Sequence, residues 1–261
     1  MTSTAIHLTI PEFQTFLVVL FRVGGIMAAL PILGSRNIPA HIKIAIAVVI
    51  GLVLVPNVHP PHVPADPLLL TAGVVSELAI GLMIGLAVRL LFSSLEIAGE
   101  VMGAQMGFGI VQLLDPFSSH QTPLVSHFQV IVASMTFLSL NAHFLLVRAV
   151  ADSFEMIRPF GASLTSDLVE DVLHLTHGMF VVALKVAAPV LAASILVNVM
   201  LGILGRAVAQ MNVFVLSFPV TIGCGLLVMG IALPYAQELY QAEFGRLLEA
   251  INGLLGVLGH G

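Results

Sequence analysis

The sequence has few charged residues, one cysteine and no tryptophan. Lysine, arginine, aspartate and glutamate make up 9% of its 261 residues, whereas about a quarter of the residues of a soluble domain are charged. The 58% hydrophobic share is spread over the whole length, so no segment is polar enough to form a separate soluble domain. The composition therefore predicts one domain, residues 1–261, that lies in or against a membrane.

The scarce residue types also argue against several classes of function. The single Cys224 cannot form an intrachain disulfide, and we expect it to be a small core residue. Only two lysines, Lys43 and Lys185, are present, and there is no phosphate-binding glycine–lysine motif for nucleotide hydrolysis. A net charge of −5 leaves no basic patch for nucleic acid. His174 and His177 have helical spacing but no third ligand, so neither a metal nor another cofactor is expected.

Six apolar runs are long enough to cross a bilayer, which takes about 20 helical residues. They cover residues 13–33, 42–58, 68–92, 125–150, 179–204 and 213–235. A seventh helix is predicted over 95–114, where two glutamates and two glutamines favour protein contact over lipid. Since no nucleophile is gathered with a base, no enzyme is expected. We predict an all-α polytopic membrane protein of about six long hydrophobic helices.

Two further segments, 167–175 and 240–258, are amphipathic. Each either lies along a membrane or partner surface or packs on the chain's own core. Pro189 and Pro219 fall inside the last two apolar runs, where neighbouring helices or water must satisfy the carbonyls that proline leaves unpaired.

Several charged side chains lie in the predicted helices, within or near the apolar runs. An unpaired charge in such a run costs a few kcal/mol, so each must be paired, hydrated or buried by protein. The residues singled out on this ground are Arg22, Glu77, Arg89, Glu96, Glu100, Arg148 and Lys185. Glu96 and Glu100 lie one helical turn apart, and such a pair could be a proton or ion site or could have a structural or pore-lining role.

Glycines at every fourth position predict helix faces against which another backbone packs closely. Gly99, Gly103 and Gly107 follow this spacing. The segment after Gly107 is bulky and apolar and ends in a proline turn. It fits a gasket that closes a pore by dewetting, and a buried helix-to-loop transition is the alternative. The candidate gasket residues are Phe108, Ile110, Val111, Leu113, Leu114 and Phe117.

A set of motifs along nearly the whole chain resembles the FliR family of flagellar export proteins and its injectisome counterpart, the SctT proteins. The motifs are Arg22 with Pro31, Ile38-Pro39 before Lys43, Glu77-x-x-x-Gly81-x-x-x-Gly85, Ala98-Gly99-x-x-x-Gly103-x-x-x-Gly107, Asp115-Pro116, Asn141-x-His143, Ala188-Pro189, and Gln210-Met211-Asn212-Val213-Phe214 followed by Phe218-Pro219. The last is the most specific. Ala209 departs from the pattern, where a proline is expected.

The resemblance implies helical hairpins within a helical export-gate assembly in the bacterial inner membrane, at the flagellar basal body. It implies FliP and FliQ as partners, FlhB and FlhA nearby, and unfolded flagellar proteins as substrates. Residues 108–117 would match the family's plug, and the glycines with Gln210 and Asn212 would serve assembly. The alternative is a small independent proton-coupled transporter that uses Glu77, Glu96 and Glu100.

Overall fold

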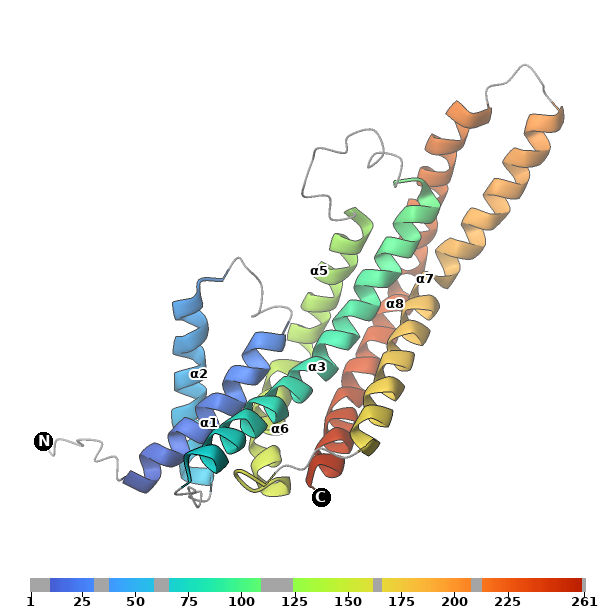
Figure 1. Ribbon diagram of the computed structural model, residues 1–261. Helices are drawn as coiled ribbons and strands as arrows, with labels where there is room; N and C mark the ends of the chain where they lie inside the picture. The colour runs from blue at the N-terminus through green and yellow to red at the C-terminus, as the bar shows by residue number, and fades with distance from the viewer. Residues whose placement is uncertain are drawn as a thin grey trace, which may run out of the picture. The chain divides into compact units, whose positions relative to one another are not determined.

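The computed structural model describes residues 10–30, 38–58, 66–108, 124–161, 166–207 and 213–259, and every regular element in these ranges is a helix (Figure 1). The elements are α1 (Ile10–Ala29), α2 (Ala40–Leu54), the 3₁₀ turn η1 (Val55–Asn57), α3 (Pro67–Met106), α5 (Leu124–Ser139), α6 (Ala142–Met156), α7 (Ser166–Ala207) and α8 (Val213–Gly259). The predicted all-α class is confirmed.

The apolar helices match the predicted number of spans. Within the described residues, α1, α2 with η1, α3, α7 and α8 are each long and apolar enough to cross a membrane, and α5 with α6 passes the same test as one bent pair. The result is five to six candidate spans, as expected for a polytopic membrane protein.

Several predicted boundaries were wrong because a change in hydropathy does not break a helix. The runs 68–92 and 95–114 were expected to be separate, but α3 continues through both to Met106. The Ser94 hydroxyl donates to the Leu91 carbonyl at 2.6 Å, so this polar side chain is satisfied inside the helix. Likewise the two amphipathic segments are parts of α7 and α8, and these helices continue through Pro189 and Pro219.

The run 125–150 was predicted to be one helix, but it forms two, α5 and α6. The chain breaks between α5 and α6, where Asn141 adopts a left-handed backbone with φ of 53°. Asparagine tolerates this conformation better than most residues. Its neighbours are apolar, so hydropathy alone predicts one continuous helix here.

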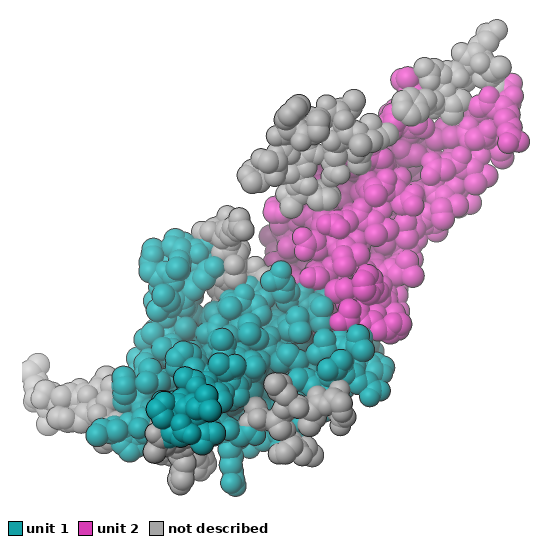
Figure 2. All heavy atoms as spheres, viewed as in Figure 1, with its two compact units in different colours: residues 1–90, 141–175, 245–261 teal, residues 91–140, 176–244 magenta. Residues whose placement is uncertain are grey.

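The chain forms two compact units, shown in teal and magenta in Figure 2. Unit 1 comprises residues 1–90, 141–175 and 245–261, and unit 2 comprises 91–140 and 176–244. Helices α3, α7 and α8 contribute to both. Whether the whole chain behaves as one domain stays a prediction.

Each unit has its own buried core. In unit 2, the rings of Phe92, Phe137 and Phe244 meet with centroids 5.4–5.6 Å apart, and the Tyr240 hydroxyl donates to the Gln129 side-chain oxygen. In unit 1, Ile251 and Leu255 of α8 are 1% and 0% exposed. The apolar stripe of 240–258 is thus buried within the chain, which decides its two alternatives in favour of the chain's own core.

The glycines near the end of α3 have three different roles. A Cβ added to Gly99 would collide with Ser126 Cα of α5 and lie 2.7 Å from its backbone nitrogen. At Gly103 the nearest atom is Val125 Cβ at 3.6 Å, an ordinary contact. Gly107 lies beyond the helix with φ of +90°, where a residue without a Cβ is favoured.

Gly107 therefore caps α3, and its predicted role in helix packing stays a prediction. Its N–H donates to the Ala104 carbonyl at 3.1 Å, and the Phe108 N–H donates to the Gly103 carbonyl at 3.0 Å. This pair of bonds is the Schellman pattern that satisfies the last carbonyls of a helix. Of the three glycines, only Gly99 is held at a close backbone approach.

We expect Gly99→Ala to destabilise the contact between α3 and α5, because the new methyl group must push the Ser126 backbone away. Overpacking of this kind costs about 1–3 kcal/mol. Gly103→Ala is the matched control on the same helix and should melt at or above the wild-type temperature, since alanine favours helix by about 1 kcal/mol. Thermal unfolding in detergent, followed by size-exclusion chromatography, distinguishes the variants. Equal melting of both would contradict the close approach.

Candidate functional site: a buried ion pair where α1 crosses α3

Two of the seven predicted intramembrane charges meet inside unit 1. Arg22 of α1 and Glu77 of α3 are both 0% exposed. The Arg22 Nε donates to Glu77 Oε2 at 2.8 Å, and Nη2 lies 2.7 Å from the same oxygen. Nη2 is within ion-pair distance but has no well-directed hydrogen bond of its own. The chain thus supplies each of these charges with an opposite charge at contact distance.

The guanidinium also binds α6. Its Nη1 donates to the Ser153 hydroxyl oxygen at 2.9 Å, and that hydroxyl donates to the Val150 carbonyl at 2.6 Å. The Arg22 Cζ lies 3.8 Å from the centroid of the Phe154 ring, where the face of the ring attracts a cation. One side chain of α1 therefore connects α3 with α6.

The second oxygen of Glu77 binds the turn that follows α6. Its Oε1 accepts the Phe160 N–H at 2.8 Å. Phe160 has φ of 64°, which is rare for a bulky residue and costs about 1–3 kcal/mol. Sequence reasoning missed Phe160, because the turn signals of its neighbours Pro159 and Gly161 do not indicate that a phenylalanine takes the left-handed position.

Glycines bring α1 and α3 close enough for this pairing. A Cβ on Gly81 would collide with the Arg22 carbonyl oxygen, and one on Gly25 would lie 2.5 Å from the Leu78 carbonyl oxygen. At Gly85 the added atom would lie 2.5 Å from the Ala29 Cβ. Glu77, Gly81 and Gly85 share one face of α3 at four-residue spacing. Gly81 and Gly85 were expected to be packing residues, whereas Gly25 was not. Its neighbour Gly24 faces open space.

The remaining predicted charges lie on the surface of this chain. All of them are exposed: Arg89, Glu96 and Glu100 of α3, Arg148 of α6 and Lys185 of α7. The chain itself does not bury them, because they lie on helix faces that the described elements leave uncovered. Glu96 instead contributes its backbone carbonyl, which accepts the Ser126 hydroxyl at 2.9 Å.

The predicted gasket falls almost entirely outside the described residues. Phe108 is half-buried directly after the cap of α3. Outside the described residues lie Ile110, Val111, Leu113, Leu114 and Phe117, and the assembly candidates Gln210 and Asn212. Their roles stay predictions.

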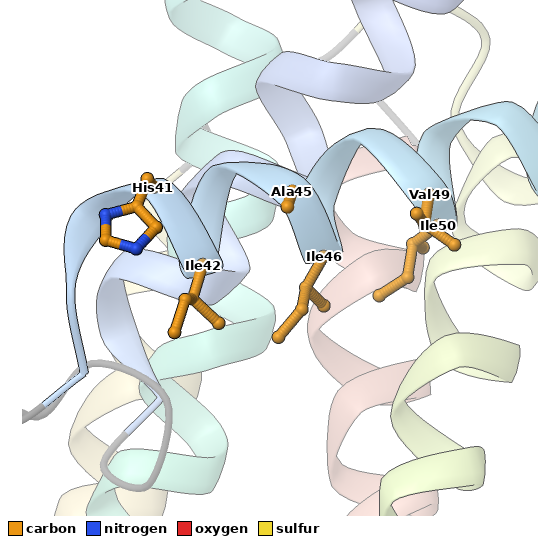
Figure 3. Close-up of a pocket in the computed structure, with 6 residues that line it drawn as sticks. All are labelled: His41, Ile42, Ala45, Ile46, Val49 and Ile50. Carbon is orange, nitrogen blue, oxygen red and sulfur yellow. The ribbon is translucent and has the colours of Figure 1, made fainter.

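A groove along α2 is lined almost entirely by aliphatic side chains. It is lined by His41, Ile42, Ala45, Ile46, Val49 and Ile50, which lie along one side of the helix (Figure 3). All but the imidazole are aliphatic. Among the described residues, no group of three or more histidine, cysteine, aspartate or glutamate side chains is placed to hold a metal ion.

Comparison with known proteins gives the family. Residues 13–247 match the family model described as bacterial export proteins, family 1. The flagellar biosynthetic protein FliR of Bacillus subtilis (strain 168) is 29% identical over 251 residues, which is 95% of this chain and 96% of that protein. The chain belongs to the FliR family of bacterial export proteins. The FliR of Aquifex aeolicus (strain VF5) is 30% identical over 84% of this chain and 85% of its own length, and that of Escherichia coli (strain K12) is 27% identical over 90% and 92%.

Membership confirms the resemblance predicted from the motifs. The match includes both Arg22 and Glu77, which lie within residues 13–247. The FliR relatives are named as flagellar biosynthetic proteins rather than as enzymes. The site that the chain forms consists of a buried ion pair and close helix packing.

Replacing either partner of the pair is expected to destabilise this FliR-family chain strongly. Arg22→Met leaves the Glu77 carboxylate buried without its cation, and Glu77→Leu leaves the guanidinium without its anion, at a cost of about 3–5 kcal/mol each. The double variant should cost clearly less than the sum, because no uncompensated charge is left. A double-mutant cycle of unfolding free energies in detergent measures this coupling.

The control is the Arg148–Asp152 pair of α6, which is 3.5 Å apart with the arginine side chain 71% exposed. Arg148→Met should change stability by less than about 1 kcal/mol. Additive effects of the Arg22 and Glu77 substitutions would show that the two side chains are not coupled.

Proposed function

We propose that this chain is a structural core subunit of the flagellar type III protein export gate, in the bacterial inner membrane at the flagellar basal body. It would assemble with FliP and FliQ, near FlhB and FlhA, at the channel entrance for unfolded flagellar proteins, and flagellum assembly would require it. The family and the names of the FliR relatives support this role.

The observation that carries the proposal is the length over which the helices expose apolar side chains. Helices α3, α7 and α8 have 40, 42 and 47 residues, or roughly 60–70 Å at about 1.5 Å per residue. The hydrocarbon core of a bilayer is only about 30 Å thick. On α7, Val169 near the start is 62% exposed and Ile203 near the end is 65% exposed. At ordinary helix tilts of about 20°, lipid does not cover both ends, so other protein subunits are needed.

The exposed charges support the same conclusion. Arg22 and Glu77 compensate each other within the chain, whereas Arg89, Glu100 and Lys185 are exposed on long apolar helices. Such charges need water or side chains from another protein. Both are present in an assembly that surrounds an aqueous path for exported proteins.

The independent transporter has less support. It requires Glu77 as one of its proton-binding groups, but Arg22 binds one carboxylate oxygen and the Phe160 N–H binds the other. Because both oxygens of the Glu77 carboxylate already accept hydrogen bonds from the protein, this side chain is better suited to a fixed structural role than to proton transfer. Such a transporter would also have to cover the exposed apolar length of α7 with lipid alone.

The testing experiment is a mild-detergent pull-down of the tagged chain from its own cells, with mass spectrometry of the partners and motility assays of the deletion strain. We expect FliP and FliQ to be recovered in stable ratio, and flagellin export and motility to be lost without the chain. Recovery of the chain alone from motile cells would reject the export gate. Proton flux through the purified single chain in liposomes would then favour the transporter.

We predict that residues 110–114 seal the channel. Replacing them with glycine and serine keeps the length of the segment but removes its bulk, so the dewetted constriction is lost. Cells carrying this variant should leak small ions and solutes while FliP and FliQ still copurify with the chain. Unchanged impermeability in cells with a correctly assembled complex would contradict a gasket.

A further inference from the structure

The turn between α6 and α7 contains a backbone conformation that its sequence disfavours. The Gly161 N–H donates to the Arg158 carbonyl at 2.9 Å, so Pro159 and Phe160 are the two central residues of a β-turn. A positive φ at the second central position is normally supplied by glycine. Here glycine is the next residue, and Phe160 adopts φ of 64°.

Two contacts with α3 hold Phe160 in this conformation. Its N–H donates to Glu77 Oε1 at 2.8 Å, and hydrogen bonds to a carboxylate are stronger than those to neutral acceptors. Its ring occupies the space left by the missing side chain of Gly73, where an added Cβ would collide with Phe160 Cδ1 and lie 2.9 Å from Cε1. Both contacts lie one turn apart on α3.

The end of α6 is attached separately. Arg22 binds the Ser153 hydroxyl through Nη1, and its ion pair uses Glu77 Oε2, whereas Phe160 uses Oε1. Releasing Phe160 therefore breaks neither the ion pair nor the contact between Arg22 and Ser153. The strained turn can open while α1, α3 and α6 remain packed.

We propose that the turn of residues 158–161 is a strained latch: Glu77 and Gly73 hold Phe160 closed, and local release opens this turn without unfolding unit 1. Glu77 thus has two separate roles. One oxygen pairs with Arg22 in the core, and the other closes the latch. The proposal rests on the geometry of the turn alone and is independent of the proposed function.

The test is hydrogen–deuterium exchange of the full chain in detergent, resolved to the Phe160 and Gly161 amides and corrected for intrinsic rates. Gly73→Ala removes the space for the ring, so we expect at least about tenfold faster exchange at these amides. Protection of the α6 amides should not change. The control is Gly24→Ala on α1, where an added Cβ meets nothing within 4 Å and exchange should equal that of the wild type.

A second pair of variants isolates the backbone strain. Phe160→Ala and Phe160→Gly both remove the ring, but only glycine adopts a positive φ without strain. The alanine variant should exchange about tenfold faster than the glycine variant, which corresponds to about 1.4 kcal/mol. Equal exchange in these two variants would overturn the latch. It would also be overturned if α6 lost protection together with the turn, because the turn would then open only with the whole unit.

Discussion

Unit 1 depends on the close crossing of α1 and α3. Gly25 and Gly81 leave no room for a side chain between the two backbones, and this approach places Arg22 one hydrogen-bond length from Glu77. A buried ion pair alone is weak support for stability because desolvation of both charges offsets their attraction. Close glycine packing supplies contacts that do not carry that penalty, and the pair then fixes which faces of the helices meet.

The crossing also explains how α6 is placed. Helix α6 is separated from α5 by the break at Asn141, so continuity of the chain does not orient it. Instead it is held from the side by Arg22 through Ser153 and Phe154. Glu77 also binds the backbone after α6. The Arg22 guanidinium of α1 and the Glu77 carboxylate of α3 thus bind each other, α6 and the turn that follows it. Replacing either residue therefore removes contacts that connect these four segments.

The motif that resembles the FliR family singled out Gly81 and Gly85. Composition and hydropathy predicted the all-α membrane class because nearly every segment is apolar, and they marked Arg22 and Glu77 as charges within apolar runs. They could not show that Arg22 meets Glu77, since the two are 55 positions apart. Nor could they distinguish Gly99 from Gly107, because equal spacing in the sequence does not reveal where α3 ends.

The left-handed backbone of Phe160 could not be predicted from the sequence, since contacts with α3 impose it. The breaks were also misjudged, because α3 continues through residues 93–94 and the predicted run 125–150 is broken between Ser139 and Ala142.

The distribution of charge separates two levels of organisation. Arg22 and Glu77 are compensated inside the chain, and they belong to the fold of unit 1. Arg89, Glu96, Glu100 and Lys185 are exposed, on helices whose length exceeds the thickness of a bilayer. In lipid these four residues would carry the full cost of an unpaired charge. These charges are compensated only if protein or water faces them, and the proposed export-gate assembly would meet that requirement.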